Sequence, residues 1–196
     1  MSIAADWPTS REVLEYYRIA LSALDEAART AIAQPYRIPS HQFPNDSKIQ
    51  SKVEEIYAKQ RTELEHQVVL MLTASFEAIF QVDFRDRVEN RRRDDLSKAL
   101  RDFHKRLQRR KRGSGRASFE ELLDIWKAHT GNAQAIGQLN QLVQYRHWLA
   151  HGRYWNQKSG LSLVDPFEAT QRGRQVLDAL RDHSKLLAVT ADELVL

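Results

Sequence analysis

The stretch QYRHWLAHG, which begins at Gln144, contains residue types that can move protons and hold a phosphate. Arg146, His147 and His151 lie within six residues of one another, and Gly152 follows directly. Histidine changes charge near neutral pH and therefore suits acid and base catalysis. A guanidinium keeps its positive charge and can stabilise negative charge that develops on a phosphate. These three side chains are the candidate catalytic residues.

A helix must position them. The apolar spacing predicts a helix over about 132–151, ended by the glycine. At about 100° per residue, His147 and His151 lie on one face, about 40° apart. Arg146 and His151 are about 140° apart, so both reach one pocket only through the length of the arginine or a distorted last turn. The positions expected to face the core are Ile136, Leu139, Val143 and Ala150.

An arginine five residues before a histidine is weak evidence by itself. The chain contains a second such pair, Arg61 and His66, in the stretch KQRTELEHQ, which we expect to be a solvated helix face. A histidine at a helix end is often only a cap. Arg146 could instead pair with Asp165 or Glu77. From the residues alone, the catalytic and the structural interpretation both stay open.

Helical periodicity dominates the rest of the chain, and no strand-like alternation persists. Thr9 with Glu12, and Ser118 with Glu121, form capping boxes that predict two helix starts. Asp165, Pro166 and Glu168 predict a third. Tyr16 and Phe167 are among the apolar residues expected on core-facing positions. The pattern predicts an all-α helical bundle of five to six helices, covering about 9–33, 48–84, 94–110, 118–130, 132–151 and 165–187.

Length and composition limit the class of protein. The 196 residues suffice for one hydrophobic core, and we expect one compact unit: an N-terminal helix and Pro-containing connector (1–47) and a helical domain (48–196) with a basic insert (85–116). The absence of cysteine excludes disulfides and thiolate chemistry. No cofactor or metal is expected. Without a secretory leader or about 18 consecutive apolar residues, we expect a cytoplasmic protein that does not span a membrane.

Positive charge is concentrated in the basic insert. The chain has a net charge of +4, but residues 85–116 contain 14 Lys and Arg against five Asp and Glu. Such a surface binds a phosphate polymer by releasing counterions, although a solvated charged face is the simpler interpretation. Two aromatic residues after the motif offer surfaces on which bases can stack, whereas Trp148 is expected in the core. The candidate RNA-binding residues are Arg106, Arg109, Arg110, Lys111, Arg112, Arg153, Tyr154 and Trp155.

The stretch YRHWLAHG resembles the Arg-x(4–6)-His motif of the HEPN superfamily, in which a polar residue follows the arginine. Arg146, His147 and His151 occupy those three places. The stretch LTASFEAIFQVDF (72–84) resembles the core helix of HEPN proteins of the RiboL-PSP type. The resemblance covers about residues 50–190.

This resemblance implies a metal-independent endoribonuclease, often a toxin or antiviral effector that an antitoxin protein can silence. It also implies a homodimer, in which two motif helices build one composite cleft. His151 would be the base or acid, Arg146 would stabilise charge, and His147 would position or assist. The products would be a 2′,3′-cyclic phosphate and a 5′-hydroxyl. Two alternatives are a catalytically inactive HEPN-like module that binds RNA or a protein, and a basic helical nucleic-acid binder that acts through 85–116.

Overall fold

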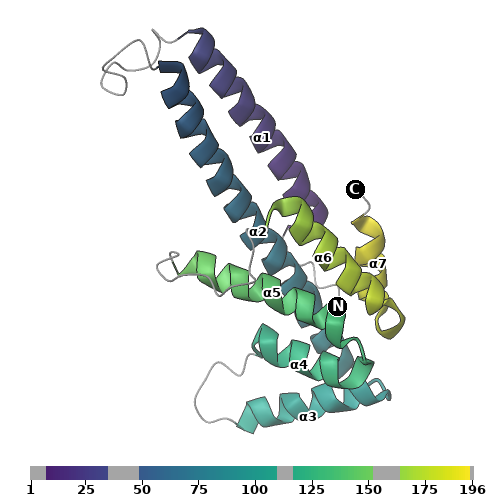
Figure 1. The fold of residues 1–196 in the computed structure, drawn as a ribbon. Coiled ribbons are helices and arrows are strands. Elements are labelled where there is room, and N and C mark those ends of the chain that lie inside the picture. Colours follow the sequence, from purple (N-terminus) through teal and green to yellow (C-terminus); the bar gives the residue numbers. More distant parts are fainter. Residues whose placement is uncertain (1–7, 35–48, 110–116, 152–163, 195–196) are drawn as a thin grey trace.

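Two long antiparallel helices form the frame of the molecule. The computed structural model describes residues 8–34, 49–109, 117–151 and 164–194. Helix α1 (Ser10–Ala33) packs along α2 (Ile49–Glu89). The C-terminal half of α1 and the N-terminal half of α2 extend beyond the other helices as a two-helix arm (Figure 1). In this arm, Arg61 of α2 forms an ion pair with Asp25 of α1.

The other helices pack around the second half of α2. In chain order, α3, α4 and α5 lie side by side and alternate in direction, and α6 and α7 cover the neighbouring side (Figure 1). No strand occurs in the described ranges, so the all-α bundle is confirmed, with seven α-helices there instead of the expected five or six. Their bounds are α3 (Asp95–Arg109), α4 (Phe119–Thr130), α5 (Ala133–Ala150), α6 (Pro166–Ala179) and α7 (Lys185–Glu193).

The additional helix arises because the last predicted helix is broken. The sequence predicts one helix over 165–187, but α6 is followed by a short 3₁₀ turn (Arg181–His183) and then by α7. Ser184 explains the break, since its hydroxyl accepts a hydrogen bond from Leu187 N (3.4 Å) and donates one to Asp83 of α2 (2.6 Å). The first bond caps α7, and the second fixes its start on α2.

The predicted helix starts are confirmed. Thr9 and Ser118 each cap a helix and form the reciprocal capping box with the glutamate three residues later. Asp165 caps α6 by accepting a hydrogen bond from Glu168 N (2.7 Å), with proline in the first turn. Helix α4 ends at Gly131, whose φ of 73° is a left-handed conformation that glycine adopts without a steric penalty.

The core follows most of the predicted stripes, but several predicted core positions are exposed. Val68, Leu72 and Phe76 of α2 are buried, as expected for the apolar stretch 68–80. Tyr16 is 48% exposed because Val13 and Tyr17, four residues apart, occupy the buried face of α1. Phe167 is 50% exposed, and its ring makes an edge contact with Tyr17, with ring centroids 6.1 Å apart. Ala150, at the last position of α5, is exposed rather than in the core.

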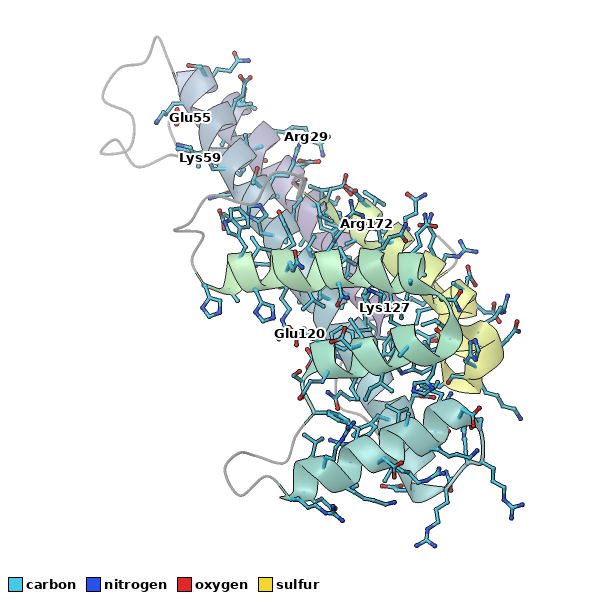
Figure 2. All side chains as sticks on the ribbon, turned by 60° about the horizontal axis from the view of Figure 1, so that its bottom comes forward. Arg29, Glu55, Lys59, Glu120, Lys127 and Arg172 are labelled. Atoms are coloured by element: carbon cyan, nitrogen blue, oxygen red, sulfur yellow. The ribbon has the colours of Figure 1, made fainter. Side chains whose placement is uncertain are left out.

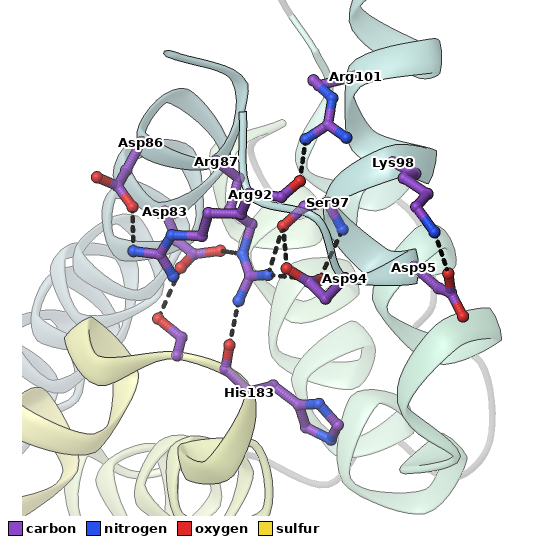
Figure 3. Close-up of polar contacts among 11 residues, drawn as sticks. Asp83, Asp86, Arg87, Arg92, Asp94, Asp95, Ser97, Lys98, Arg101 and His183 are labelled. Atoms are coloured by element: carbon purple, nitrogen blue, oxygen red, sulfur yellow. Dashed lines mark hydrogen bonds and ion pairs between the residues drawn. The ribbon is translucent and has the colours of Figure 1, made fainter. Parts of the chain in front are cut away.

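A buried arginine joins three parts of the bundle (Figure 3). Arg87 of α2 is 1% exposed, and its Nε donates to Asp83 at 2.5 Å. Its other nitrogens donate to Ser97 Oγ (3.0 Å), to Asp94 (3.2 Å) and to the backbone carbonyl of His183. Burial raises the pKa of Asp94, but the hydrogen bonds from Ser97 and the charge of Arg87 together lower it below its ordinary value. This arginine of the basic insert therefore belongs to the interior.

Helix α2 also meets a simple criterion for a membrane span. Over Gln50–Glu89 it is long and apolar enough to cross a membrane, although the sequence contains no uninterrupted apolar run of that length. Of its most apolar 18-residue window, 61% is buried inside the structure. A core helix passes the same criterion of length and composition, and this burial is what a core helix shows.

Candidate functional site

The C-terminal end of α5 carries the three candidate catalytic residues. Asn132 precedes the helix and His151 is its C-cap, so the predicted range 132–151 is confirmed. The backbone N–H of His151 donates to the carbonyl of His147 at 3.1 Å and closes the last turn. His151 is exposed at this end, and Gly152 lies outside the described residues.

His147 and His151 lie next to each other on the exposed side of α5. Their ring centroids are 6.3 Å apart and their planes are inclined by 34°. The side chain of His147 is 50% exposed. The expectation that both rings share one helix face is therefore met, and both are accessible to a bound substrate.

Arg146 points toward a different neighbour. Its Nη1 forms an ion pair with Glu77 of α2, and the two side chains are 33% and 21% exposed. Glu77 is one of the two partners that the sequence left open for this arginine. The structure brings the two histidines together and places the ion pair of the arginine on the α2 side of the helix. The arginine is thus anchored by an ion pair, with a third of its side chain still exposed.

One residue of the site was missed by the sequence. Glu120, in the first turn of α4, has its Oε1 2.9 Å from Nε2 of His147. Figure 2 labels Glu120 at the start of α4 and Lys127 nearer its other end. The only signal for this contact is the short connection between α4 and α5, which predicts that the start of one helix meets the end of the other.

An aromatic cluster holds the end of α5 against α2. The rings of Tyr145 and Trp148 have centroids 5.6 Å apart, and each lies within 6.3–6.4 Å of the His66 ring. His66 is 7% exposed, so the prediction of a solvated face for KQRTELEHQ is wrong at this residue. It is correct at Arg61, whose side chain is 52% exposed. His66 is buried because the last turns of α5 cover α2 here, whereas Arg61 lies farther out on the arm.

The basic insert is less uniformly positive than its composition suggests. Arg87 is buried, and three further cations form ion pairs with neighbouring aspartates, namely Arg92 with Asp86, Lys98 with Asp95 and Lys105 with Asp102. Two of the predicted RNA-binding residues, Arg106 and Arg109, are exposed in the last turns of α3. The remaining ones, Arg110, Lys111, Arg112, Arg153, Tyr154 and Trp155, lie outside the described residues.

Arg106, Arg109 and the two histidines lie at the same edge of the molecule. Helices α3 and α5 both end there, and α4 begins there (Figure 1). Arg109 at the end of α3, Glu120 at the start of α4 and His151 at the end of α5 are therefore on successive helices along one edge.

Other features of the described part of the chain lie away from this edge. A hollow of about 830 Å³ between α1 and α7 is lined by Arg11, Glu15, Arg18 and Asp192, among others, and by none of the candidate residues. Within the described ranges, no group of three or more histidine, aspartate or glutamate side chains is arranged to hold a metal ion.

Comparisons of the chain with protein-family models, with curated proteins and with solved structures gave no match.

Proposed function

We propose that the protein is an endoribonuclease that cleaves RNA without a metal ion at the end of α5. The observation that carries this proposal is the exposed pair of imidazoles, His147 and His151, with ring centroids 6.3 Å apart. One imidazole accepts the proton of a 2′-hydroxyl while the 2′-oxygen bonds to phosphorus. The other donates a proton to the 5′-oxygen as the bond between phosphorus and that oxygen breaks. Each ring needs only a hydrogen-bond distance of about 3 Å to its oxygen, so both can reach one phosphodiester.

Arg146 supplies the positive charge that this reaction needs. A guanidinium has five N–H donors, and Arg146 forms its ion pair with Glu77 through Nη1. The remaining donors can bind a phosphoryl oxygen while Glu77 keeps the group in place. Because the guanidinium is held before the substrate arrives, little reorganisation is needed when negative charge develops on the phosphate.

The resemblance of YRHWLAHG to the HEPN motif supports the same activity and extends the proposal. It adds a homodimer in which two α5 ends face each other, since a two-fold axis brings the same patch of both chains together. It also adds a role as a toxin or phage-defence effector in the cytoplasm, silenced by an antitoxin protein. The products are a 2′,3′-cyclic phosphate and a 5′-hydroxyl.

A second candidate function is a catalytically inactive module that binds RNA or a protein. The ion pair between Arg146 and Glu77 favours it, because such a pair is also what a structural arginine forms. In this case the basic end of α3 would bind RNA, and the end of α5 would serve only as an interface between the two chains.

Cleavage in EDTA separates the two candidates. End-labelled RNA is incubated with the wild-type protein and with the variants His147→Ala, His151→Ala and His129→Ala. Removal of a catalytic acid or base typically costs about 10²–10⁴-fold in rate, so we expect losses of this size for the first two variants. His129 is the matched control, because it is an exposed histidine in the last turn of α4, at the other end of that helix from Glu120.

Cyclic-phosphate products that form in EDTA and depend on His147 and His151 would support the ribonuclease. RNA binding without cleavage would support the binding module. Cleavage that survives both alanine substitutions would place any catalytic centre elsewhere.

A further inference from the structure

The carboxylate of Glu120 lies beside the proposed catalytic centre although it belongs to another helix. Its Oε1 is 2.9 Å from Nε2 of His147. Helices α4 and α5 run antiparallel and are connected through Gly131 and Asn132, so the first turn of α4 meets the last turn of α5. The contact is therefore built by the helix hairpin and not by neighbouring positions in the sequence.

The chemistry of the two groups determines where the proton lies. A carboxylate has no hydrogen to donate, so its approach to Nε2 at 2.9 Å is favourable only when Nε2 carries the hydrogen. In the neutral ring, the lone pair that can accept a further proton is then on Nδ1. Glu120 thus selects one of the two tautomers of His147 and fixes the orientation of its ring.

We infer that Glu120 is a positioning residue for the proposed ribonuclease reaction, acting through His147. Proton exchange between this histidine and RNA takes place at Nδ1, because Nε2 is occupied by the carboxylate. The inference rests on the proposed function and adds to it a residue outside the Arg-x4-His motif. Carboxylates that hold a functional imidazole in one tautomer act in the same way at metal sites and in catalytic triads.

The charge of Glu120 gives this inference a distinctive consequence. The carboxylate adds a negative charge beside the surface on which RNA phosphates bind, so its removal should strengthen RNA binding. The same removal should slow the chemical step, because His147 loses its fixed orientation. The side chains of His147 and Glu120 are 50% and 47% exposed, so their ion pair contributes little to stability. A lower kcat with an equal or lower KM is therefore the signature of positioning.

A structural explanation of Glu120 makes a different prediction. Acidic residues are favoured in the first turn of any helix, where they interact with the helix dipole. The cap of α4 is already provided by Ser118 and Glu121. If Glu120 acted only on the dipole, its replacement would change stability slightly and would leave His147 unaffected. Asp124 is an exposed acidic residue one turn farther along α4. Its replacement shows how far the loss of any negative charge on this helix changes the reaction.

The experiment combines kinetics with a direct measurement of the tautomer. Glu120→Gln and the control Asp124→Asn are compared with the full-length wild-type chain. The ¹⁵N shifts of labelled histidines are recorded in alkaline buffer, and the His147 signals are assigned from their loss in His147→Ala. The kcat, KM and pH–rate profile of RNA cleavage are measured in EDTA. We expect one tautomer with the proton on Nε2 in the wild type and in Asp124→Asn, and a mixture in Glu120→Gln, since an amide both donates and accepts.

In Glu120→Gln we expect kcat to fall by about 10–100-fold, as for carboxylates that orient metal-bound histidines, and KM to stay equal or fall. The pH–rate profile should change in this variant and not in Asp124→Asn. An unchanged tautomer together with an unchanged kcat would overturn the role of Glu120. A wild-type protein whose tautomer depends on Glu120 but which cleaves no RNA would support the positioning contact and overturn the ribonuclease.

Discussion

At the scale of single residues, the end of α5 divides its polar side chains between two neighbouring helices. Arg146 pairs with Glu77 on α2, and His147 pairs with Glu120 on α4. The arginine pair is the more buried of the two, with side chains 33% and 21% exposed against 50% and 47%. The first pair therefore contributes to stability as well as to the site, whereas the second acts mainly on the histidine.

A double-mutant cycle measures the first pair. Urea unfolding of Glu77→Gln, Arg146→Gln and the double variant should give a coupling of about 1 kcal/mol, because a hydrogen bond to a charged and partly buried group is worth more than one at the surface. The exposed pair of Lys52 and Glu55 provides a matched control, for which we expect only about 0.3 kcal/mol. Equal couplings for both pairs would show that Glu77 does not anchor the arginine.

The sequence predicted which candidate residues share a face of α5, but it did not predict which residues of other helices contact them. Helical spacing predicts that His147 and His151 share a face, because that depends only on the rotation per residue. It does not predict Glu120, which contacts His147 through the packing of another helix. His66 was misjudged for the same reason, since α5 covers a part of α2 that looks polar in the sequence. The sequence spacing determines which residues share a face of one helix. Contacts between different helices depend on how the helices pack, which the spacing does not give.

At the scale of helices, the sequence predicted the starts that local caps mark but did not predict the break between α6 and α7. Thr9, Ser118 and Asp165 mark helix starts by side chains that bond only three residues ahead. The break between α6 and α7 depends instead on Ser184, which bonds to Asp83, 101 positions away in the chain. A prediction from local spacing alone therefore gives one helix over 165–187 where the structure has two.

At position 173, where α6 contacts α2, only glycine fits without a clash. A Cβ atom added at Gly173 would lie 2.0–2.6 Å from the ring of Phe76, which is 1% exposed and has no space to move. We expect Gly173→Ala to lower the free energy of unfolding by about 1–3 kcal/mol through overpacking. Gly137 of α5 is the control, since an added Cβ there meets nothing within 4 Å.

Gly137→Ala should raise stability by up to about 1 kcal/mol, because alanine favours the helix. Thermal and urea unfolding of both variants would check the opposite signs. A loss of stability in Gly137→Ala as large as that in Gly173→Ala would contradict the steric explanation.

At the scale of the whole molecule, the positive charge of the basic insert is spread over the end of α2 and the length of α3. Residues 85–116 have a net charge of +9, but the buried Arg87 and the paired cations reduce what the surface presents. The exposed Arg106 and Arg109 lie at the end of α3, on the edge where α5 ends. Composition predicted a basic segment correctly, and it could not indicate which cations are neutralised, because that depends on the fold.

Charge reversal at Arg109 and in the basic residues that follow it in the sequence should weaken RNA binding and its dependence on salt. Replacing Arg109, Arg110, Lys111 and Arg112 by Glu should reduce the slope of log K against log salt concentration by up to about 3, since each lost phosphate contact on a single strand contributes about 0.7. Replacing Lys52 and Lys59, on the arm, by Glu should change the slope little. Binding isotherms at several salt concentrations give both slopes. An unchanged slope in the first variant would exclude these residues as the RNA-binding surface.

The turn between α4 and α5 affects the contact between His147 and Glu120 at the far end of the two helices. Gly131 and Asn132 alone connect the two helices, and His147 lies fifteen residues beyond this connection, about 22 Å along the helix axis. A longer turn would release α5 to rotate about its axis relative to α4, and a rotation of about 100°, the angle of one helical residue, would carry His147 out of reach of Glu120. The length of a two-residue connector at one end of the hairpin thereby dictates which side chains meet at the opposite end.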